Sequence, residues 1–483
     1  MRKTDFDRIA EFVQAVCCSP GSPPSQNLLA IIASNADQAM ADVATRWIEA
    51  GYSLHVASDA EARWIGSRLI WRSPSARYVR KIAVVSSRLG HKLDLQDRLF
   101  QALRTVVLRA HPRQDQFVVA AGCAAESHVR RCVELFGRGM VRVFDSPANL
   151  SLGEWLRLKL SATDVVAGVH DVSPELPSSP QRAIVAAEVR RVPLRDRTQF
   201  AFADQVMALQ VRRRGHTASL LSFALADRTF EPGAIRVHID TCDSQLSEEL
   251  TANGAVALHL LSNGQNEFPA APDHAAEPPA QIRAMESINT HEYLGHWTRR
   301  RRGPWPGQPD DEYADELILG LASKDRSALS SLARIVAQRK LLASVGSNRT
   351  GAPVVSFTAV PLHEWSMHRT FRSHRVRWDF EPYGICIKRD WLDGVGATPV
   401  IYGDEDEWKS LPNESRYRFQ PKQSMTRSGK TIDWTSEREF RFPGDVDLER
   451  VGIDDAFVFV PTIEEARHLA RISRWPIVVI HKC

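Results

Sequence analysis

The chain has 483 residues, of which 43% are hydrophobic and 25% are charged, a composition typical of folded globular domains and unlike that of disordered or collagen-like chains. At about 100 to 200 residues per domain, this length predicts two or three domains, each with its own core. The 62 basic and 58 acidic side chains give a net charge of +4, too small for a whole-protein electrostatic footprint on nucleic acid. Any contact with a polyanion must therefore use a local patch.

Two features bear on location and redox state. Residues 1–8 are charged where a secretory signal would be apolar, and no run reaches the roughly 18 apolar residues of a membrane helix. We therefore expect a cytoplasmic protein with no membrane partner. The seven cysteines lack a CxxC pair and ligand-spaced histidines, which favours reduced thiols and no bound metal.

In the first half of the chain, short apolar runs alternate with longer amphipathic runs, as in crossover units around a parallel sheet. We expect strands at 28–33, 53–57, 81–86, 117–121, 140–144, 183–187, 206–211 and 235–239. Helices are expected at 34–50, 94–110 and 126–136. The pattern predicts an α/β fold in which an N-terminal segment, 1–27, precedes a Rossmann-like, doubly wound parallel sheet at 28–262.

Ligands of such open sheets bind beyond the carboxyl ends of the strands. The residues at these positions are Ser34, Asn35, Asp37, 86–90, Gly122, Glu126 and 215–217. They form neither a GxGxxG nor a Walker phosphate loop, so they are either ordinary loop and N-cap residues or the lining of a nucleotide-sensing pocket.

The segment 195–211, RDRTQFAFADQVMALQV, resembles the late helix and strand of LOG-type and DNA-processing Rossmann proteins. The resemblance implies a nucleotide or single-stranded DNA as ligand. It covers one segment and lacks the glycine-rich phosphate loop of that family, so it assigns no catalytic residue.

The segment 268–280 contains four prolines and few side chains that could pack, which predicts a linker across 263–290. Eight of the twelve tryptophans lie beyond residue 290, among short strand-like runs and turns, with one helix expected at 326–342. We therefore expect a second, α+β domain at 291–483.

Four consecutive arginines, 299–302, lie between Trp297 and Trp305. Arginines on a loop can grip phosphate bidentately, and cations beside aromatic rings are typical of single-strand binders. A second mixed group further along the chain comprises Trp408, Lys409, Arg416, Tyr417, Arg418 and Lys422. Either group can equally be a solvated charged surface. The nucleic-acid hypothesis assigns contacts to Arg300, Arg301, Arg302 and Trp305.

Two further segments carry candidate chemistry. Ser356 and Thr358 share one face of an expected strand, because strand side chains alternate. Glu437 and Glu439 are expected on one strand face with Arg441, where paired carboxylates can divide the roles of base and charge stabiliser. A water-facing strand and a surface ladder of charges are the structural alternatives.

Four segments keep the order seen in the abortive-infection family AbiGi, which this region resembles. They are 354–362, 383–391, 398–402 and 437–441, with Phe440 where that family has tryptophan. The match spans 354–442 and implies an anti-phage or abortive-infection setting.

The order of a histidine-bearing strand, a Ser-x-Thr strand and a late Glu-x-Glu is similar to ADP-ribosyltransferase folds, which use NAD. The resemblance implies that His296 or Arg299 holds the cofactor and that Ser356 and Thr358 support the nicotinamide pocket. It assigns Glu439 to stabilising the ribosyl cation and Glu437 to orienting the acceptor. Tyr383 joins the expected cofactor-binding residues, and the first strand matches least well.

Three functional hypotheses follow. The first is a sensor and effector protein, with a nucleotide-binding Rossmann-like domain and an ADP-ribosyltransferase-like domain. The second is a DNA- or RNA-binding or base-modifying component of a DNA modification or restriction system. The third is a catalytically inactive interaction module. The residues leave open whether the protein is an enzyme.

Overall fold

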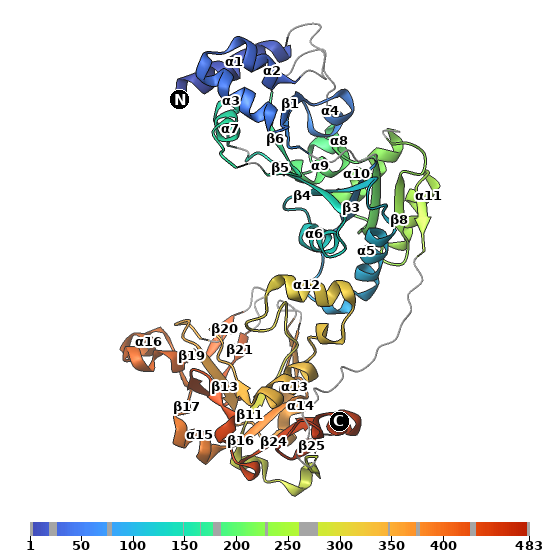
Figure 1. Ribbon diagram of the computed structural model, residues 1–483. Helices are drawn as coiled ribbons and strands as arrows, with labels where there is room; N and C mark the ends of the chain where they lie inside the picture. Colours follow the sequence, from blue (N-terminus) through green and yellow to red (C-terminus); the bar gives the residue numbers. More distant parts are fainter. Residues whose placement is uncertain are drawn as a thin grey trace. The chain divides into compact units, whose positions relative to one another are not determined.

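The computed structural model describes residues 3–18, 27–74, 80–147, 149–164, 166–176, 185–227, 230–259, 279–345, 348–372, 377–425 and 431–480. The chain divides into two compact units, whose elements are labelled in Figure 1. The first comprises Met1–Gln265 and Gln308–Lys324, and the second comprises Asn266–Gly307 and Asp325–Cys483. The chain thus enters the second unit, returns to the first and enters the second again.

The described part of the first unit contains a nine-stranded sheet in the order β1-β2-β6-β5-β4-β3-β7-β8-β9. The strands are β1 (Ser53–Val56), β2 (Arg68–Arg72), β3 (Arg80–Ser86), β4 (Asp115–Ala120), β5 (Gly139–Asp145), β6 (Val169–Glu175), β7 (Gln205–Gln210), β8 (Ile235–His238) and β9 (Val256–Leu258). Strands β6 through β9 in this order run parallel, whereas β1 and β2 are antiparallel at one edge. Phe117, Val118 and Val119 of β4 are all buried, as expected of a strand covered on both faces.

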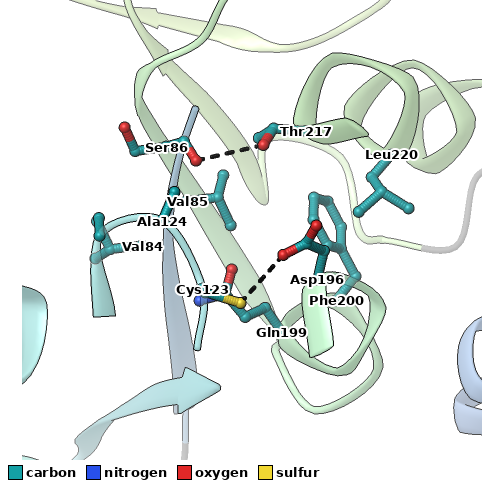
Figure 2. A pocket seen from close by; sticks show the side chains of 11 residues that line it. Val84, Val85, Ser86, Cys123, Ala124, Asp196, Gln199, Phe200, Thr217 and Leu220 are labelled. Carbon is teal, nitrogen blue, oxygen red and sulfur yellow. Dashed lines mark hydrogen bonds between the residues drawn. The ribbon is translucent and has the colours of Figure 1, made fainter. Parts of the chain in front are cut away.

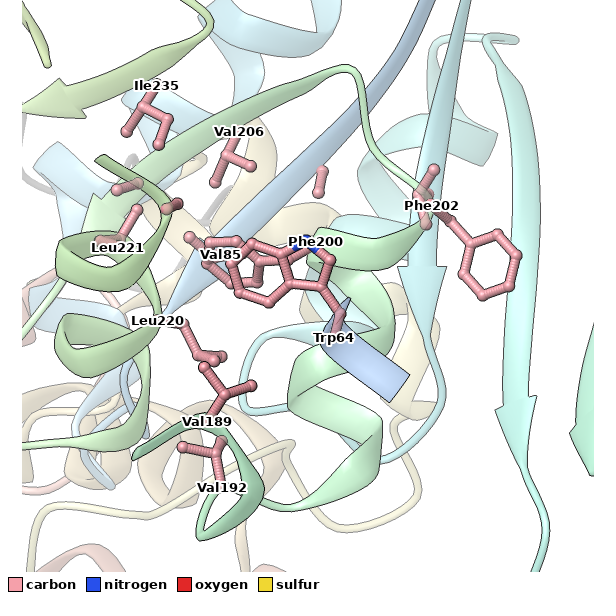
Figure 3. Packing of buried hydrophobic residues seen from close by; sticks show 14 of the residues in the cluster. Trp64, Val85, Val189, Val192, Phe200, Phe202, Val206, Leu220, Leu221 and Ile235 are labelled. Carbon is pink, nitrogen blue, oxygen red and sulfur yellow. The ribbon is translucent and has the colours of Figure 1, made fainter. Parts of the chain in front are cut away.

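Helices cover both faces of this sheet. One face carries α5 (Asp97–Arg109), α6 (Glu126–Leu135) and α12 (Asp310–Leu319), and the other carries α4 (Asp59–Ile65), α8 (Ala187–Arg190), α9 (Leu194–Ala201), α10 (His216–Ala226) and α11 (Ser244–Ala252). On the second face Trp64 stacks on Phe200 with ring centroids 5.1 Å apart (Figure 3). The expected Rossmann-like, parallel-rich α/β sheet is confirmed.

A third core lies at the antiparallel edge. There α1 (Lys3–Cys18), α2 (Leu28–Asn35), α3 (Gln38–Glu49) and α7 (Leu152–Leu160) pack around β1 and β2. Phe6 and Val13 of α1 are buried in this core, so the first unit begins before residue 28, where the sequence placed its start.

The helix α12 also belongs to the first unit, although its sequence lies beyond the predicted linker. Leu317 and Ile318 are buried against α5 and α6, and Arg131 of α6 forms a bidentate ion pair with Asp315 at 2.7 and 2.6 Å. Residues 308–324 therefore belong to the first unit, although the sequence analysis placed them in the second domain, 291–483, and ended the first domain, 28–262, before them. Residues 263–278 of the predicted linker, 263–290, lie outside the described residues.

One predicted strand is wrong: residues 28–33 belong to helix α2. Asn27 caps this helix by accepting a hydrogen bond from the N–H of Leu29 at 3.1 Å, and Leu28, Leu29 and Ile32 are its buried residues. A short apolar run fits a buried strand and a buried helix equally well. Of the expected strand at 183–187, residues 183–184 lie outside the described part and Ala187 begins α8. Strands β2, β6 and β9 were not predicted.

The described part of the second unit is built on an eight-stranded sheet in the order β10-β25-β24-β16-β11-β13-β22-β17. Its strands are β10 (Ile282–Ala284), β11 (Tyr293–Trp297), β13 (Val354–Thr358), β16 (Gly384–Lys388), β17 (Thr398–Pro399), β22 (Glu439–Pro443), β24 (Ala456–Val460) and β25 (Ile477–Val479). Two-stranded pairs flank it: β12 (Lys340–Leu341) with β23 (Val446–Asp447), β14 (Thr370–Arg372) with β15 (Arg377–Asp379), β18 (Ile401–Gly403) with β19 (Phe419–Pro421), and β20 (Gln423–Met425) with β21 (Thr431–Asp433).

The two faces of this sheet differ. One packs against α13 (Ala328–Gln338), α15 (Arg389–Val395) and α17 (Ile463–Ala470) in a mainly aliphatic core. The other carries an aromatic cluster that includes Trp297, Trp365, Phe380 and Phe459, next to the short α14 (Trp365–His368). The sequence predicted α13 in approximate position, but α15, α17 and the exposed α16 (Glu405–Ser410) were not predicted.

Candidate ligand-binding site

A pocket opens at the carboxyl edge of the first sheet, where β3, β4 and β7 end (Figure 2). The chain leaves β3 toward β4 on one side and leaves β7 toward β8 on the other, so the pocket lies at the topological switch point. Its lining comprises Val84, Val85, Ser86, Cys123, Ala124, Ala125, Asp196, Gln199, Phe200, Thr217 and Leu220.

Small residues keep this edge open. Gly122 follows β4 with φ +77°, a left-handed conformation that glycine adopts without a steric penalty. A Cβ at this position would lie 3.5 Å from Cδ of Arg195, which is ordinary van der Waals contact, so the backbone conformation favours glycine here and space does not require it. The alanines that follow, Ala124 and Ala125, line the pocket without filling it.

The first turn of α10 supplies hydrogen-bond donors. Its N-cap is Gly215, which has no side chain to cap the N–H groups of this turn. The Thr217 hydroxyl donates to the carbonyl of Ser86 at 3.4 Å, which joins α10 to the end of β3 (Figure 2). An uncapped helix N-terminus of this kind attracts anions through its N–H groups and its dipole.

The loop before α10 adds positive charge. Arg212, Arg213 and Arg214 are all exposed, and Arg213 pairs with Glu249 at 3.0 Å. Within the described residues, no ion pair engages Arg212, Arg214 or the exposed Arg88 that follows β3. This edge of the sheet therefore favours an anionic ligand.

An acceptor faces these donors across the pocket. Asp196 accepts a hydrogen bond from the Cys123 thiol at 3.4 Å, and its other oxygen lies 3.6 Å from Nδ1 of His216. Burial, followed by the charge of Asp196, raises the pKa of the Cys123 thiol. The thiol stays protonated and is unsuited to act as a nucleophile.

The structure brings only some of the residues predicted for this edge together. Ser86 and Thr217 line the pocket, and Gly122 and Gly215 shape it, whereas Glu126 pairs with Arg142 at 3.2 Å. Ser34, Asn35 and Asp37 lie elsewhere, because residues 28–35 are helical. There Ser34 and Asn35 bond back to their own helix, and Asp37 caps α3.

Sequence reasoning missed Cys123, Asp196 and Gln199 as pocket residues. Asp196 and Gln199 lie within the segment 195–211 that resembles LOG-type and DNA-processing proteins. The resemblance of that segment therefore pointed to this part of the site, although it assigned no role to any residue.

In the second unit, the predicted catalytic residues do not converge. Gly295 pairs with Thr358, and Thr358 pairs with Glu439, so these three positions share one face of the sheet. His296, next to Gly295, lies on the opposite face, where its Nδ1 bonds the carbonyl of Ser356 at 2.9 Å. Burial lowers the pKa of His296 to about 4, so its ring is neutral near pH 7.

Glu439 is engaged by Arg441. The Arg441 Nε and Nη2 atoms donate to the two Glu439 oxygens at 2.9 and 3.0 Å. Glu437 belongs to a 3₁₀ turn, Thr435–Glu437, and Arg438 follows with φ +44°. The expectation that Glu437 and Glu439 share a strand face is therefore wrong, because the chain turns between them.

The expected cofactor-binding residues are also dispersed. Ser356 and Thr358 share a face, but the Thr358 hydroxyl donates to the carbonyl of Glu437. The Tyr383 hydroxyl donates to Glu465 at 2.9 Å, and Arg299 is exposed. With His296 on the far face, these residues do not form the NAD site that the transferase resemblance implies.

The arginine-rich turn, residues 299–305, makes several of its contacts within the protein. Arg326 and Arg334 lie 4.6 and 5.2 Å from the ring centroid of Trp305, and Arg326 is fully buried. The Arg301 guanidinium donates to the carbonyl of Pro304, and the backbone N–H of Arg300 lies 3.5 Å from Glu381. Arg302 is exposed, whereas Trp297 is buried in the aromatic cluster. The turn is thus more a structural unit than an open binding surface.

Comparisons with known proteins found a distant structural match and no match in sequence. No family model and no curated protein matches the chain. The solved structure of DNA processing protein A (DprA) from Streptococcus pneumoniae is similar at a TM-score of 0.27 and 13% identity, covering 53% of this chain and 90% of that chain. This likeness is too distant to bear on function. Among the described residues, no helix has the length and apolar character needed to cross a membrane.

Proposed function

We propose that the first unit binds a phosphate-bearing small molecule, a nucleotide, in the pocket at the switch point of its sheet. The observation that carries this proposal is the uncapped N-terminus of α10, which lies beside Thr217 at the pocket. Helix N-termini at this place in open parallel sheets are suited to phosphate.

Each part of the ligand has a suitable partner in the proposed complex. The phosphate would accept hydrogen bonds from the first turn of α10 and from the Thr217 hydroxyl, which would release the Ser86 carbonyl, with Arg212 and Arg214 adding charge. Asp196 and Gln199 would bond a hydroxyl or amino group of the same ligand. The pocket encloses only about 10 Å³, so most of the nucleotide would lie outside it, along the edge of the sheet.

The second unit would act as the effector in this proposal, without an assigned reaction. The chain passes between the two units three times, near residue 265 and on both sides of α12, which provides covalent routes for a signal. NAD-dependent transfer and the anti-phage setting rest on sequence resemblance, and His296 and Glu439 on opposite faces of the sheet do not support the transfer chemistry. We derive no catalytic step from these residues.

Calorimetric titration of the full chain with AMP, ADP, ATP, NAD and inorganic phosphate tests the proposal. We expect at least one nucleotide to bind, and Arg212→Gln with Arg214→Gln to weaken it about tenfold, as expected for two charge-assisted contacts near the surface. Arg213→Gln is the matched control, because Glu249 already engages Arg213. If none of these ligands binds, or if Arg213→Gln weakens binding as much as the double variant does, the proposal is contradicted.

A further inference from the structure

A second basic and aromatic feature lies in the hairpin of the second unit formed by β14 and β15. Phe371 of β14 pairs directly with Trp378 of β15, and their ring centroids are 5.4 Å apart. Both rings face solvent, with 47% of Phe371 and 42% of Trp378 exposed. Exposed aromatic side chains placed side by side are unusual on a surface that binds nothing.

The hairpin is anchored at its base. Phe380, directly after β15, is buried against Trp297 with ring centroids 5.3 Å apart. Its φ is +56°, a conformation that is costly for a residue with a bulky side chain and persists only where packing enforces it. The aromatic pair Phe371 and Trp378 is therefore presented from a fixed base.

The chain around this pair is rich in arginine. Residues 366–378 include four arginines and no acidic residue, and Asp379, which follows Trp378, is buried. The guanidinium of Arg369 lies 4.6 Å from the Trp378 ring centroid, and its buried Nε has no hydrogen-bond partner among the described residues. In the described part of the chain, no carboxylate pairs with Arg369, so its charge is available to a polyanion.

We propose that this hairpin is a binding surface for single-stranded nucleic acid. Bases stack on Phe371 and Trp378, while the Arg369 guanidinium contacts a phosphate. Stacking requires unpaired bases, because a duplex hides its base faces. The inference is independent of the nucleotide pocket in the first unit.

Fluorescence anisotropy of the full chain with labelled oligothymidylate of about 12 nucleotides, within the site sizes of single-strand binders, tests the surface. Trp378→Leu should weaken binding at least about fivefold, whereas Trp378→Phe, which keeps a stacking face, should retain most of it. Arg369→Gln should reduce the salt dependence by about one contact. Met425→Ala, which removes an exposed side chain of the β20 and β21 hairpin, should bind like the wild type.

Several results would overturn the inference: no binding by the wild type, equal binding by Trp378→Leu, or equal affinity for duplex of the same length. Binding to phosphatidylserine vesicles in place of the oligonucleotide would assign the hairpin to a lipid surface instead. Arg212→Gln with Arg214→Gln should leave oligonucleotide binding intact, so this test and that of the nucleotide pocket can fail separately.

Discussion

Glu439 and Arg441 lie two residues apart on β22 and form a bidentate ion pair in which Arg441 is only 1% exposed. Arg441 also donates to the carbonyls of Tyr417 and Phe419 at 2.8 and 3.0 Å. The pair thus joins the main sheet to the segment before and within β19. A buried arginine with this many partners indicates a structural role for Glu439.

Glu439→Gln should therefore destabilise the protein. It leaves a buried guanidinium without its charge partner, which costs about 3 kcal/mol in the free energy of unfolding. Urea denaturation of the wild type and the variant measures this loss in the free energy of unfolding. Asp406→Asn, which breaks the exposed pair with Lys409, is the control and should cause no measurable change.

A stable but inactive Glu439→Gln variant would indicate a catalytic role. If Glu439→Gln folds as stably as the wild type but abolishes nicotinamide release from NAD, Glu439 is catalytic and the structural role is wrong. This comparison requires the wild type to release nicotinamide.

Stability should fall as the pH is lowered below about 6.5, in part because of His296. Burial lowers its pKa to about 4 in the folded chain, so between pH 6.5 and 4 the unfolded state binds a proton that the folded state does not. Between pH 7 and 5 this difference costs about 2 kcal/mol. His170, whose pKa burial also lowers to about 4, acts in the same direction in the first unit.

His296→Gln separates the contribution of His296 from that of His170, because glutamine can still donate to the Ser356 carbonyl but does not titrate. Denaturation at pH 7 and pH 5 should show a smaller pH dependence in the variant. An unchanged pH dependence would mean that His296 is protonated in the folded state.

The α12 helix should be required for the stability of the first unit. Leu317 is 1% exposed in the core that α12 shares with α5 and α6, so Leu317→Ala should cost about 2 to 4 kcal/mol. Leu319→Ala, on the same helix but 37% exposed, is the matched control. Hydrogen exchange should show faster opening of α5 and α6 in Leu317→Ala alone. Equal exchange in both variants would mean that the unit is stable without α12.

These results separate what the sequence could and could not predict. The strands at 81–86, 117–121 and 140–144 were predictable because buried parallel strands are continuous apolar runs between longer amphipathic helices. The run 28–33 is also apolar but folds as a helix, so apolar character alone could not assign it. The return of α12 to the first unit depends on long-range packing that no local pattern encodes.

The candidate sites show the same division. The pocket edge was predictable from strand ends, since Ser86 and Thr217 follow expected strands. Asp196 enters the pocket from α9, a helix that was indicated only by the resemblance of segment 195–211 to a late helix and strand. The spacing of Glu437 and Glu439 suggested one strand face, but the left-handed Arg438 between them breaks the alternation.

Asp196→Asn should change the affinities of the pocket for inorganic phosphate and for a nucleotide in opposite directions. Asparagine keeps the shape of the side chain but removes a negative charge that faces the donors of α10. Inorganic phosphate, which Asp196 repels, should bind more tightly to the variant, by about fivefold for a partly screened charge. A nucleotide that uses Asp196 as an acceptor should bind more weakly by about tenfold, because a charged acceptor is lost.

The thiol of Cys123 provides an independent readout of the same change. Asp196 contributes to the raised pKa of this thiol, so Asp196→Asn should speed its alkylation by iodoacetamide, measured by peptide mass mapping. The buried Cys132 and Cys242 of the same unit are internal controls and should keep their rates. A bound nucleotide should protect Cys123 in the wild type, because the thiol lines the pocket. If the two affinities change in the same direction and nucleotide leaves Cys123 unprotected, the ligand lies outside this pocket.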